Sequence, residues 1–204
     1  SIFVACRRYL YPEFISIKKY EGINLFFPPS IRGKITDTFS HTLFSLLYLI
    51  IFKPDVKRIL VFNSANSPLA LLPKIFGKRV VINVDGLEWK RAKWGPLAKA
   101  YYRFAEFFST LVADEIIADS REIKRYYLFR FGRSSVFIPY GTYIEKSENP
   151  EILKEYGLKK DGYFFTASRL EPENNADLTV KAFKGLNTDK YLVIAGGANY
   201  KSRF

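Results

Sequence analysis

The 204-residue chain is long enough for one large α/β domain, or for one domain and part of another. Hydrophobic residues make up 48% and charged residues 25%, a composition typical of folded globular proteins, which excludes wholesale disorder. Lys and Arg number 32 against 20 Asp and Glu, and the resulting net charge of +12 favours phosphate-bearing partners such as a nucleotide, an anionic lipid or a nucleic acid. The single cysteine, Cys6, excludes an internal disulfide framework and fits a reducing compartment.

Short runs of β-branched and aromatic residues alternate with helical patterns in the first two thirds of the chain. The runs predict strands at residues 2–6, 23–27, 58–62, 80–84, 115–118 and 136–138. The helical patterns lie at residues 41–52, 68–76, 96–112 and 121–131. This alternation predicts an α/β fold with a mostly parallel sheet covered on both faces. Asp119 and Glu122 are spaced as a capping box for the last of these helices.

The last third of the chain starts a second unit. A polar stretch at residues 142–149 predicts a linker, and a helix at 150–156, a strand at 163–167, a helix at 176–186 and a strand at 192–195 follow it. These elements are typical of the opening of a second doubly wound domain. We therefore expect domains at residues 1–145 and 150–204. The longest apolar run, at residues 46–52, is far shorter than the roughly 20 residues that span a bilayer.

Ligands of open parallel sheets collect at the carboxyl ends of the strands, so the residues there are candidates for function. Arg169 follows the strand at 163–167 and precedes the helix that begins at Ala176, where guanidinium and free amide donors favour a diphosphate. The alternative is an N-cap at Asn175, with Arg169 in a surface ion pair. Gly196 and Gly197, in the turn 196–199 after the next strand, permit either close approach of a ligand or a tight turn.

Three more segments of the first domain are candidates. Residues 83–91 combine a carboxylate, an aromatic ring and cations, which suits a polyol phosphate, although an Asp-Gly turn with surface charge is an equal alternative. The small polar residues 63–67 suit sugar hydroxyls, but we favour a helix cap. His41 is the only histidine, which excludes a Ser-His-Asp triad and a His-based zinc site. We favour packing near the start of a helix for His41 over a place facing the ligand.

Four runs of residues together resemble, in this order, family 4 retaining glycosyltransferases. They lie at residues 85–95, 113–120, 139–141 and 169–175. The likeness extends to rhamnosyltransferase-like enzymes of bacterial polysaccharide assembly. It implies a GT-B-type fold of two Rossmann-like domains, in which the first holds mainly the acceptor and the second mainly the nucleotide sugar. It also implies that the family's glycine-rich loop and paired glutamates lie outside this chain. We therefore expect a gap at the place of the family's first strand, unless another polypeptide fills it, and no activity from the fragment alone.

The resemblance also assigns roles to residues. Arg169 matches the arginine that binds the donor phosphates, Asn174 stands where many relatives have Lys, and Asp85 stands where many have His beside the transferred sugar. The expected catalytic residues are Asp85 and Arg169. The expected donor-binding residues are Arg169, Glu173, Asn174, Gly196 and Gly197. The expected acceptor-binding residues are His41, Asn63, Asn66, Glu88, Trp89, Lys90 and Arg91. No metal and no cofactor are expected.

The expected partners are a nucleotide sugar donor, a glycan or lipid-linked acceptor and an anionic membrane surface. We expect a cytoplasmic protein, peripheral on the inner face of the cell membrane, because cations and aromatic residues are mixed along residues 90–103; a solvated basic face is the alternative. Two other classes of function remain open. The net charge fits a nucleic-acid-binding module, although no specific recognition motif is present, and the fold could serve as a catalytically idle scaffold.

Overall fold

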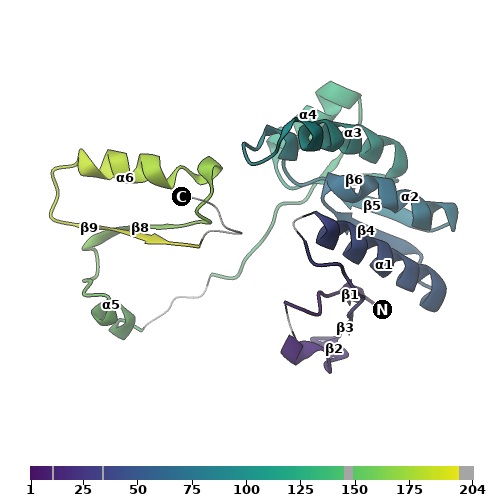
Figure 1. Ribbon diagram of the computed structural model, residues 1–204, viewed down its shortest axis with the longest axis horizontal. Coiled ribbons are helices and arrows are strands. Elements are labelled where there is room, and N and C mark those ends of the chain that lie inside the picture. Colours follow the sequence, from purple (N-terminus) through teal and green to yellow (C-terminus); the bar gives the residue numbers. More distant parts are fainter. Residues whose placement is uncertain (11, 34, 145–148, 198–204) are drawn as a thin grey trace. The chain divides into compact units, whose positions relative to one another are not determined.

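A computed structural model describes residues 1–10, 12–33, 35–144 and 149–197. The chain divides into two compact units, one of Ser1–Lys90 with Pro96–Tyr140 and one of Arg91–Gly95 with Gly141–Phe204 (Figure 1). Part of the predicted linker (145–148) and part of the predicted glycine turn (198–199) lie outside the described residues.

The first unit holds two sheets. In chain order its elements are β1 (Phe3–Ala5), η1 (Pro12–Phe14), β2 (Lys19–Tyr20), β3 (Ile23–Phe26), α1 (Thr36–Phe52), β4 (Arg58–Phe62), η2 (Ser64–Asn66), α2 (Ser67–Ile75), β5 (Arg79–Asn83), η3 (Glu88–Lys90), α3 (Pro96–Val112), β6 (Glu115–Ala118), α4 (Arg121–Phe131) and β7 (Val136–Phe137). One sheet has the order β1-β3-β2, in which β1 is parallel and β2 antiparallel to β3. The other has the order β4-β5-β6-β7 and is entirely parallel. β1 and β4 are therefore edge strands of separate sheets.

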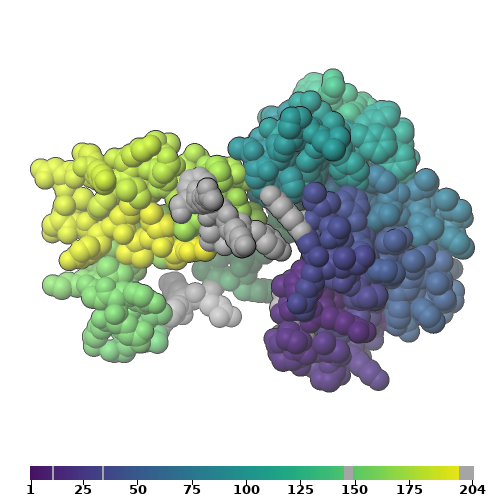
Figure 2. Space-filling view, viewed as in Figure 1, coloured from purple at the N-terminus to yellow at the C-terminus, as the bar shows by residue number. Residues whose placement is uncertain are grey.

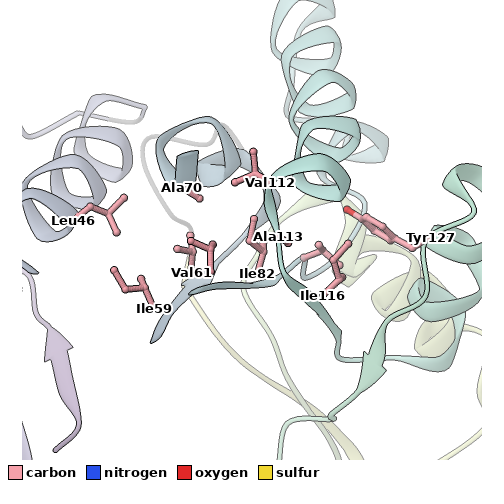
Figure 3. Packing of buried hydrophobic residues seen from close by; sticks show 11 residues of the cluster. Leu46, Ile59, Val61, Ala70, Ile82, Val112, Ala113, Ile116 and Tyr127 are labelled. Carbon is pink, nitrogen blue, oxygen red and sulfur yellow. The ribbon is translucent and has the colours of Figure 1, made fainter. Parts of the chain in front are cut away.

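The core of the first unit lies between the parallel sheet and its helices. Alternate residues of the strands are buried, such as Ile59 and Val61 on β4, because successive side chains of a strand point to opposite faces. Side chains from all four helices pack onto this face (Figure 3). The buried cluster consists of Leu46, Ile59, Val61, Ala70, Val80, Ile82, Val84, Val112, Ala113, Ile116 and Tyr127.

The opposite face of β4 is open among the described residues. Leu60 is 49% exposed and Phe62 is 53% exposed, although both are as apolar as their buried neighbours on the strand. The expectation that both faces of the sheet are covered is therefore wrong for this strand. An apolar run in the sequence indicates that burial of these side chains is favourable. It does not indicate which face of the strand the other described residues cover.

Hydrogen bonds connect α3 to α2 and to η2. The Ser67 hydroxyl at the start of α2 donates to the Ala105 carbonyl of α3 at 2.7 Å, and the Tyr101 hydroxyl donates to the Ala65 carbonyl at 2.7 Å. Burial raises the pKa of Tyr101 to about 12, so this phenol remains a donor at neutral pH. Polar groups buried in this way satisfy each other and fix the register of α2 against α3.

The N-cap of α4 lies one residue later than the capping box predicted. Ser120 is its N-cap, and the Ser120 hydroxyl oxygen accepts a 3.2 Å hydrogen bond from the Ile123 amide. Asp119 stays at the tip of β6, since the preceding residue, Ala118, still accepts a strand hydrogen bond from Ile138. The predicted pairing of Asp119 with Glu122 is therefore wrong. Gly132 ends the helix in the left-handed conformation, which glycine adopts without steric cost.

The second unit contains α5 (Glu151–Glu155), β8 (Tyr163–Ala167), η4 (Pro172–Asn174), α6 (Ala176–Lys184) and β9 (Tyr191–Ala195). β8 and β9 pair in parallel with α6 as the crossover, which is a β-α-β unit. The ring of Phe183 on α6 packs edge-on against Phe164 of β8, with 6.0 Å between centroids.

Several elements occur at their predicted bounds, namely β4, β6, β8, α3 and α4. The two-residue strand β2 and the 3-10 turns were not predicted. Within the described residues, no helix combines the length and apolar character needed to cross a membrane. Figure 2 presents the surface of the molecule, to which α3 (teal) contributes.

Candidate functional site

Polar residues of the first unit meet at the carboxyl ends of β4 to β7. The backbone amide of Asn63, after β4, donates a 2.8 Å hydrogen bond to the carbonyl of Asn83, the last residue of β5. The Asn83 side-chain amide donates to the hydroxyl of Tyr140, three residues beyond β7, at 3.4 Å. These contacts connect three strand ends into one edge, where ligands of parallel sheets bind. We call this edge the first-unit tip site, defined by Asn63, Asn83, Asp85, Asp119 and Tyr140.

Two residues of the first-unit tip site have left-handed backbones. Asn63 has φ of 71° and Asp85 has φ of 53°. Asn and Asp tolerate this conformation better than other residues with a side chain, but it still costs free energy. Such conformations persist where the surroundings impose them and are enriched at functional sites. The Asp85 amide donates to the Asn83 side-chain oxygen at 3.1 Å, which holds the turn directly after β5.

Tyr140 of the first-unit tip site has a raised pKa and is a neutral phenol at pH 7. Burial raises the pKa of Tyr140, and the negative charges of Asp85 and Asp119 raise it further. The site therefore offers two carboxylate acceptors beside a neutral hydroxyl that can donate. This combination suits a polyhydroxylated ligand, whose hydroxyl groups both donate and accept hydrogen bonds.

The loop after β5, residues 85–90, is fastened to the body of the first unit. Glu88 is buried, with 8% exposure, and the Trp89 indole nitrogen donates to Oε2 of Glu106 on α3 at 3.1 Å. The Arg103 guanidinium lies 4.5 Å from the Trp89 ring centroid, and the Lys90 ammonium lies 5.5 Å from it. Of the predicted acceptor-binding residues in this loop, Lys90 is exposed.

The two predicted acceptor-binding asparagines after β4 shape the turn. Oδ1 of Asn63 accepts from the Ala65 amide at 2.9 Å and so caps η2, in agreement with the favoured interpretation. The Asn66 side-chain amide donates to the Phe62 carbonyl at 3.0 Å. Asn66 is only 5% exposed. The Oδ1 atom of Asn66 is buried and has no hydrogen-bond partner in the described part of the chain.

His41 belongs to a different group of residues. Helix α1 begins at Thr36, so His41 lies in its second turn and not at its start as predicted. Burial lowers the pKa of His41, a hydrogen bond with the Cys6 backbone raises it, and the charges of Arg7 and Asp37 act in opposite directions. Arg7 Nε lies 2.8 Å from Asp37 Oδ2, which places this group at the carboxyl end of β1, in the three-stranded sheet.

A pocket of about 450 Å³ lies between α1 and the loop after β3. Its walls are mostly apolar, among them Phe44, Leu47 and Tyr48, with Arg8 as the charged residue. None of the residues predicted for catalysis or binding lines it.

The second unit has its own strand-end site. Arg169 follows β8 and is exposed, and the next amide, that of Leu170, donates to the Gly197 carbonyl beyond β9 at 3.0 Å. The Asn174 side-chain amide donates to the Arg169 carbonyl at 2.6 Å. Three predicted donor-binding residues, Arg169, Asn174 and Gly197, are thus brought together at the ends of β8 and β9. We call them the second-unit tip site.

The N-terminus of α6 lies next along the chain. Asn175 occupies the N-cap position, as the alternative reading of this segment predicted, but its side chain makes no capping hydrogen bond. It has a left-handed backbone with φ of 53°, and its side-chain amide donates to the Glu173 carbonyl at 3.3 Å. The first-turn amides of α6 therefore lack a side-chain cap, and such amides attract anions.

The remaining predicted residues have structural partners. A Cβ atom on Gly196 would collide with the Ser168 carbonyl oxygen, whereas one on Gly197 would meet no atom of the described residues within 4 Å. Glu173 Oε1 lies 3.0 Å from Arg91 Nε within the second unit, so a predicted donor-binding residue and a predicted acceptor-binding residue form an ion pair. Across the described ranges, no cluster of three or more His, Cys, Asp or Glu residues could hold a metal ion.

The predicted site residues omit three residues that the structure places at or behind the first-unit tip site. Asn83 ends a strand and Tyr140 belongs to the Pro-Tyr-Gly run, so their positions were available signals. Glu106 is the only acidic residue of α3, and an acid within a helix of that composition could have indicated a buried partner.

Comparisons with known proteins agree with this architecture. A family model described as "Domain of unknown function (DUF1972)" matches residues 69–143, which include the loop after β5 and continue past β7. No curated protein sequence matches the chain significantly. Twenty solved chains match, among them the crystal structure of Anabaena Alr3699/HepE in complex with UDP and glucose, with a TM-score of 0.66 and 14% identity. The match covers 97% of this chain and 54% of that one, so this chain spans about half of its solved relative. The predicted fold class, α/β of the GT-B type with Rossmann-like parallel sheets, is confirmed.

Proposed function

We propose that this chain forms the acceptor-side domain and the beginning of the donor-side domain of a retaining glycosyltransferase. The enzyme would move a hexosyl or rhamnosyl group from a nucleotide-diphosphate donor to a glycan or lipid-linked acceptor in polysaccharide assembly. The observation that carries the proposal is Arg169 at the carboxyl end of β8, in the loop that leads to the uncapped N-terminus of α6. A solved relative of the same fold that binds UDP and glucose supports it.

The second-unit tip site would stabilise the leaving group. As the bond between the sugar and the diphosphate breaks, negative charge builds on the departing phosphate oxygens. The Arg169 guanidinium and the free amides of α6 are donors of the kind that such charge requires. Preorganised donors of this kind typically contribute about 3 to 4 kcal/mol each to the transition state. The Asn174 contact with the Arg169 carbonyl would hold the loop in place, and no protein-bound metal is part of the proposed reaction.

The first-unit tip site would serve the transferred sugar and the acceptor. Asp85 follows β5 in a left-handed conformation, and Tyr140 stays protonated beside it. We propose that Asp85 makes a polar contact with the reacting sugar, while Lys90 and the loop after β5 contact the acceptor. Hydroxyl-rich ligands need both donors and acceptors, which this site supplies.

Nucleotide binding tests the donor part of the proposal. Uridine, guanosine and thymidine diphosphates are added separately to the full-length protein, and the melting temperature is measured. At least one should raise it, and Arg169→Ala should abolish the rise. Lys160→Ala is the matched control, because Lys160 is also an exposed cation of the second unit but precedes β8. If no diphosphate stabilises the protein, or if both variants respond alike, the assignment of Arg169 is wrong.

We also propose that α3 contacts an anionic membrane surface. Leu97, Phe104, Phe107 and Leu111 are exposed at helical spacing, and Leu97 is 87% exposed. The cations Lys99 and Arg103 lie on the same helix, whose only acid, Glu106, is buried. Exposed apolar and cationic side chains without exposed acids fit an anionic lipid surface.

Vesicle flotation tests the membrane contact. The protein should float with vesicles that contain phosphatidylglycerol and not with purely zwitterionic vesicles, and Leu97→Ser combined with Leu111→Ser should reduce flotation. Leu178→Ser on α6 is the control, since Leu178 belongs to the second unit and is 59% exposed, close to the 61% of Leu111. Equal flotation on both kinds of vesicle, or by all variants, would contradict this part.

A further inference from the structure

Glu106 is a carboxyl group inside the first unit. It lies in the middle of α3 and is 2% exposed. Burial of a charged group is costly unless hydrogen bonds and charges compensate for it. A buried acid therefore needs specific partners.

Glu106 has hydrogen-bond partners on two other elements, η3 and α4. Oε2 of Glu106 accepts from the Trp89 indole nitrogen of η3 at 3.1 Å and from the Tyr126 hydroxyl of α4 at 3.1 Å. Burial raises the pKa of Glu106, and the hydrogen bonds from Tyr126 and Trp89 and the charges of Arg103 and Lys90 lower it. One carboxylate oxygen thus connects the loop after β5 with α4.

Contacts with the body of the first unit orient the loop after β5. Its backbone hydrogen bonds are local, from the Glu88 amide to the Gly86 carbonyl at 3.0 Å and from the Lys90 amide to the Leu87 carbonyl at 3.0 Å. Local turns fix the shape of a loop but not its orientation toward the body of a domain. The Trp89 indole supplies a bond to a residue 17 positions later, on a long helix.

We infer that Glu106 is a positioning residue that orients the loop of residues 85–90 through Trp89, and thereby sets the affinity for the acceptor. The inference rests on the proposed function, since it deepens the role of that loop. Trp89 then acts as an anchor: its N–H is bound by Glu106, and the cations of Arg103 and Lys90 lie over its ring. Asp85 and Lys90 of the same loop remain as the residues that meet the ligand.

Tryptophan fluorescence gives a direct test, because the protein has only two Trp residues. Trp94→Phe leaves Trp89 as the sole reporter in the full-length protein. In that background, Glu106→Leu, which removes both acceptor oxygens while keeping a similar size, should increase quenching of Trp89 by acrylamide. Glu122→Leu is the matched control, since Glu122 is an exposed acid of α4. Unchanged quenching in the Glu106 variant would overturn the inference.

Kinetics then separate positioning from simple structural support. Glu106→Leu should raise the acceptor KM about tenfold, because the Trp89 N–H loses its charged acceptor, with the binding of the nucleoside diphosphate unchanged. Trp89→Phe should do the same, and the double variant should be no worse than either single one. Additive effects, or equal loss of donor binding, would contradict positioning through Trp89.

A further variant keeps the inference testable. Tyr126→Phe removes the second donor to the same oxygen but keeps the ring, so it should raise quenching less than Glu106→Leu does, even if the latter folds poorly. A result equal to or larger than that of Glu106→Leu would speak against the Trp89 link. The quenching assay needs no substrate, so its outcome does not depend on whether the protein transfers sugar.

Discussion

The side-chain amide of Asn174 donates a 2.6 Å hydrogen bond to the backbone carbonyl of Arg169. This contact closes the loop between β8 and α6 and fixes the backbone that carries the guanidinium. In the family that the sequence resembles, many members have Lys at this position. Here a neutral tether stands in the place of a second charge.

Loss of the tether should weaken donor binding. Asn174→Ala is expected to raise the Kd for the nucleoside diphosphate about fivefold, because one backbone hydrogen bond that orders Arg169 is removed. Isothermal titration calorimetry measures this change. Asn187→Ala is the control, since Asn187 is exposed in the loop before β9, at the other end of the strand. Equal Kd values for the two variants would show that the tether does not support Arg169.

The two glycines after β9 should respond differently to alanine. Gly196→Ala should destabilise the second unit by about 1 to 3 kcal/mol, because the new Cβ would overlap the Ser168 carbonyl. Gly197→Ala should leave stability nearly unchanged, since its Cβ has free space. Urea unfolding measures both. A loss of nucleotide affinity in Gly197→Ala alone would place the ligand beside this residue, whereas a large loss of stability there would contradict the packing.

The periodicity of the sequence predicted the helices and strands of this fold. It did not predict which residues pack against them. The alternation of buried and exposed residues on β4 and the helical spacing on α3 follow from local geometry, so both elements occur at their predicted bounds. The open face with Leu60 and Phe62 could not be predicted, because burial depends on which elements pack there. Ser120, and not Asp119, caps α4, since pairing of β6 with β7 keeps Asp119 at the strand tip.

The candidate sites were predictable where residues follow strands directly. Arg169 and Asp85 were found because a strand end positions whatever follows it. Glu106 was not, because its role depends on contacts with residues 17 positions before it and 20 positions after it along the chain. Roles of this kind arise from tertiary packing, and local sequence patterns do not contain them.

The Asp114 carboxylate should make the free energy of unfolding depend on pH. Its carboxylate accepts from the Val80 amide at 2.7 Å and from Lys74 at 2.9 Å, and these contacts lower the pKa of Asp114 below its ordinary 3.8. Because the folded pKa is the lower one, the stabilisation is present above the unfolded pKa and is lost as the pH falls through the folded pKa. Asp114→Asn should therefore cost about 1 to 3 kcal/mol at pH 7 and progressively less in acid.

Urea unfolding between pH 2.5 and 7 checks this dependence. The difference between the wild-type protein and Asp114→Asn should shrink as the pH falls. Asp55→Asn is the control, because Asp55 is an exposed acid between α1 and β4. A difference that stays constant with pH would mean that the ionised carboxylate contributes nothing beyond its shape.

Asp85 combines a chemical and a conformational role, and substitution separates them. Asp85→Asn keeps a residue that tolerates the left-handed backbone, so stability should hold while sugar transfer falls at least about a hundredfold. Asp85→Ala should lose transfer and also about 1 kcal/mol of stability. Asp161 is the matched control, because it has φ of 61° in the turn before β8. Asp161→Ala should cost similar stability and leave the turnover number unchanged. If Asp85→Asn transferred sugar at the wild-type rate, the carboxylate would have no part in the reaction, and the strained turn alone would explain its presence.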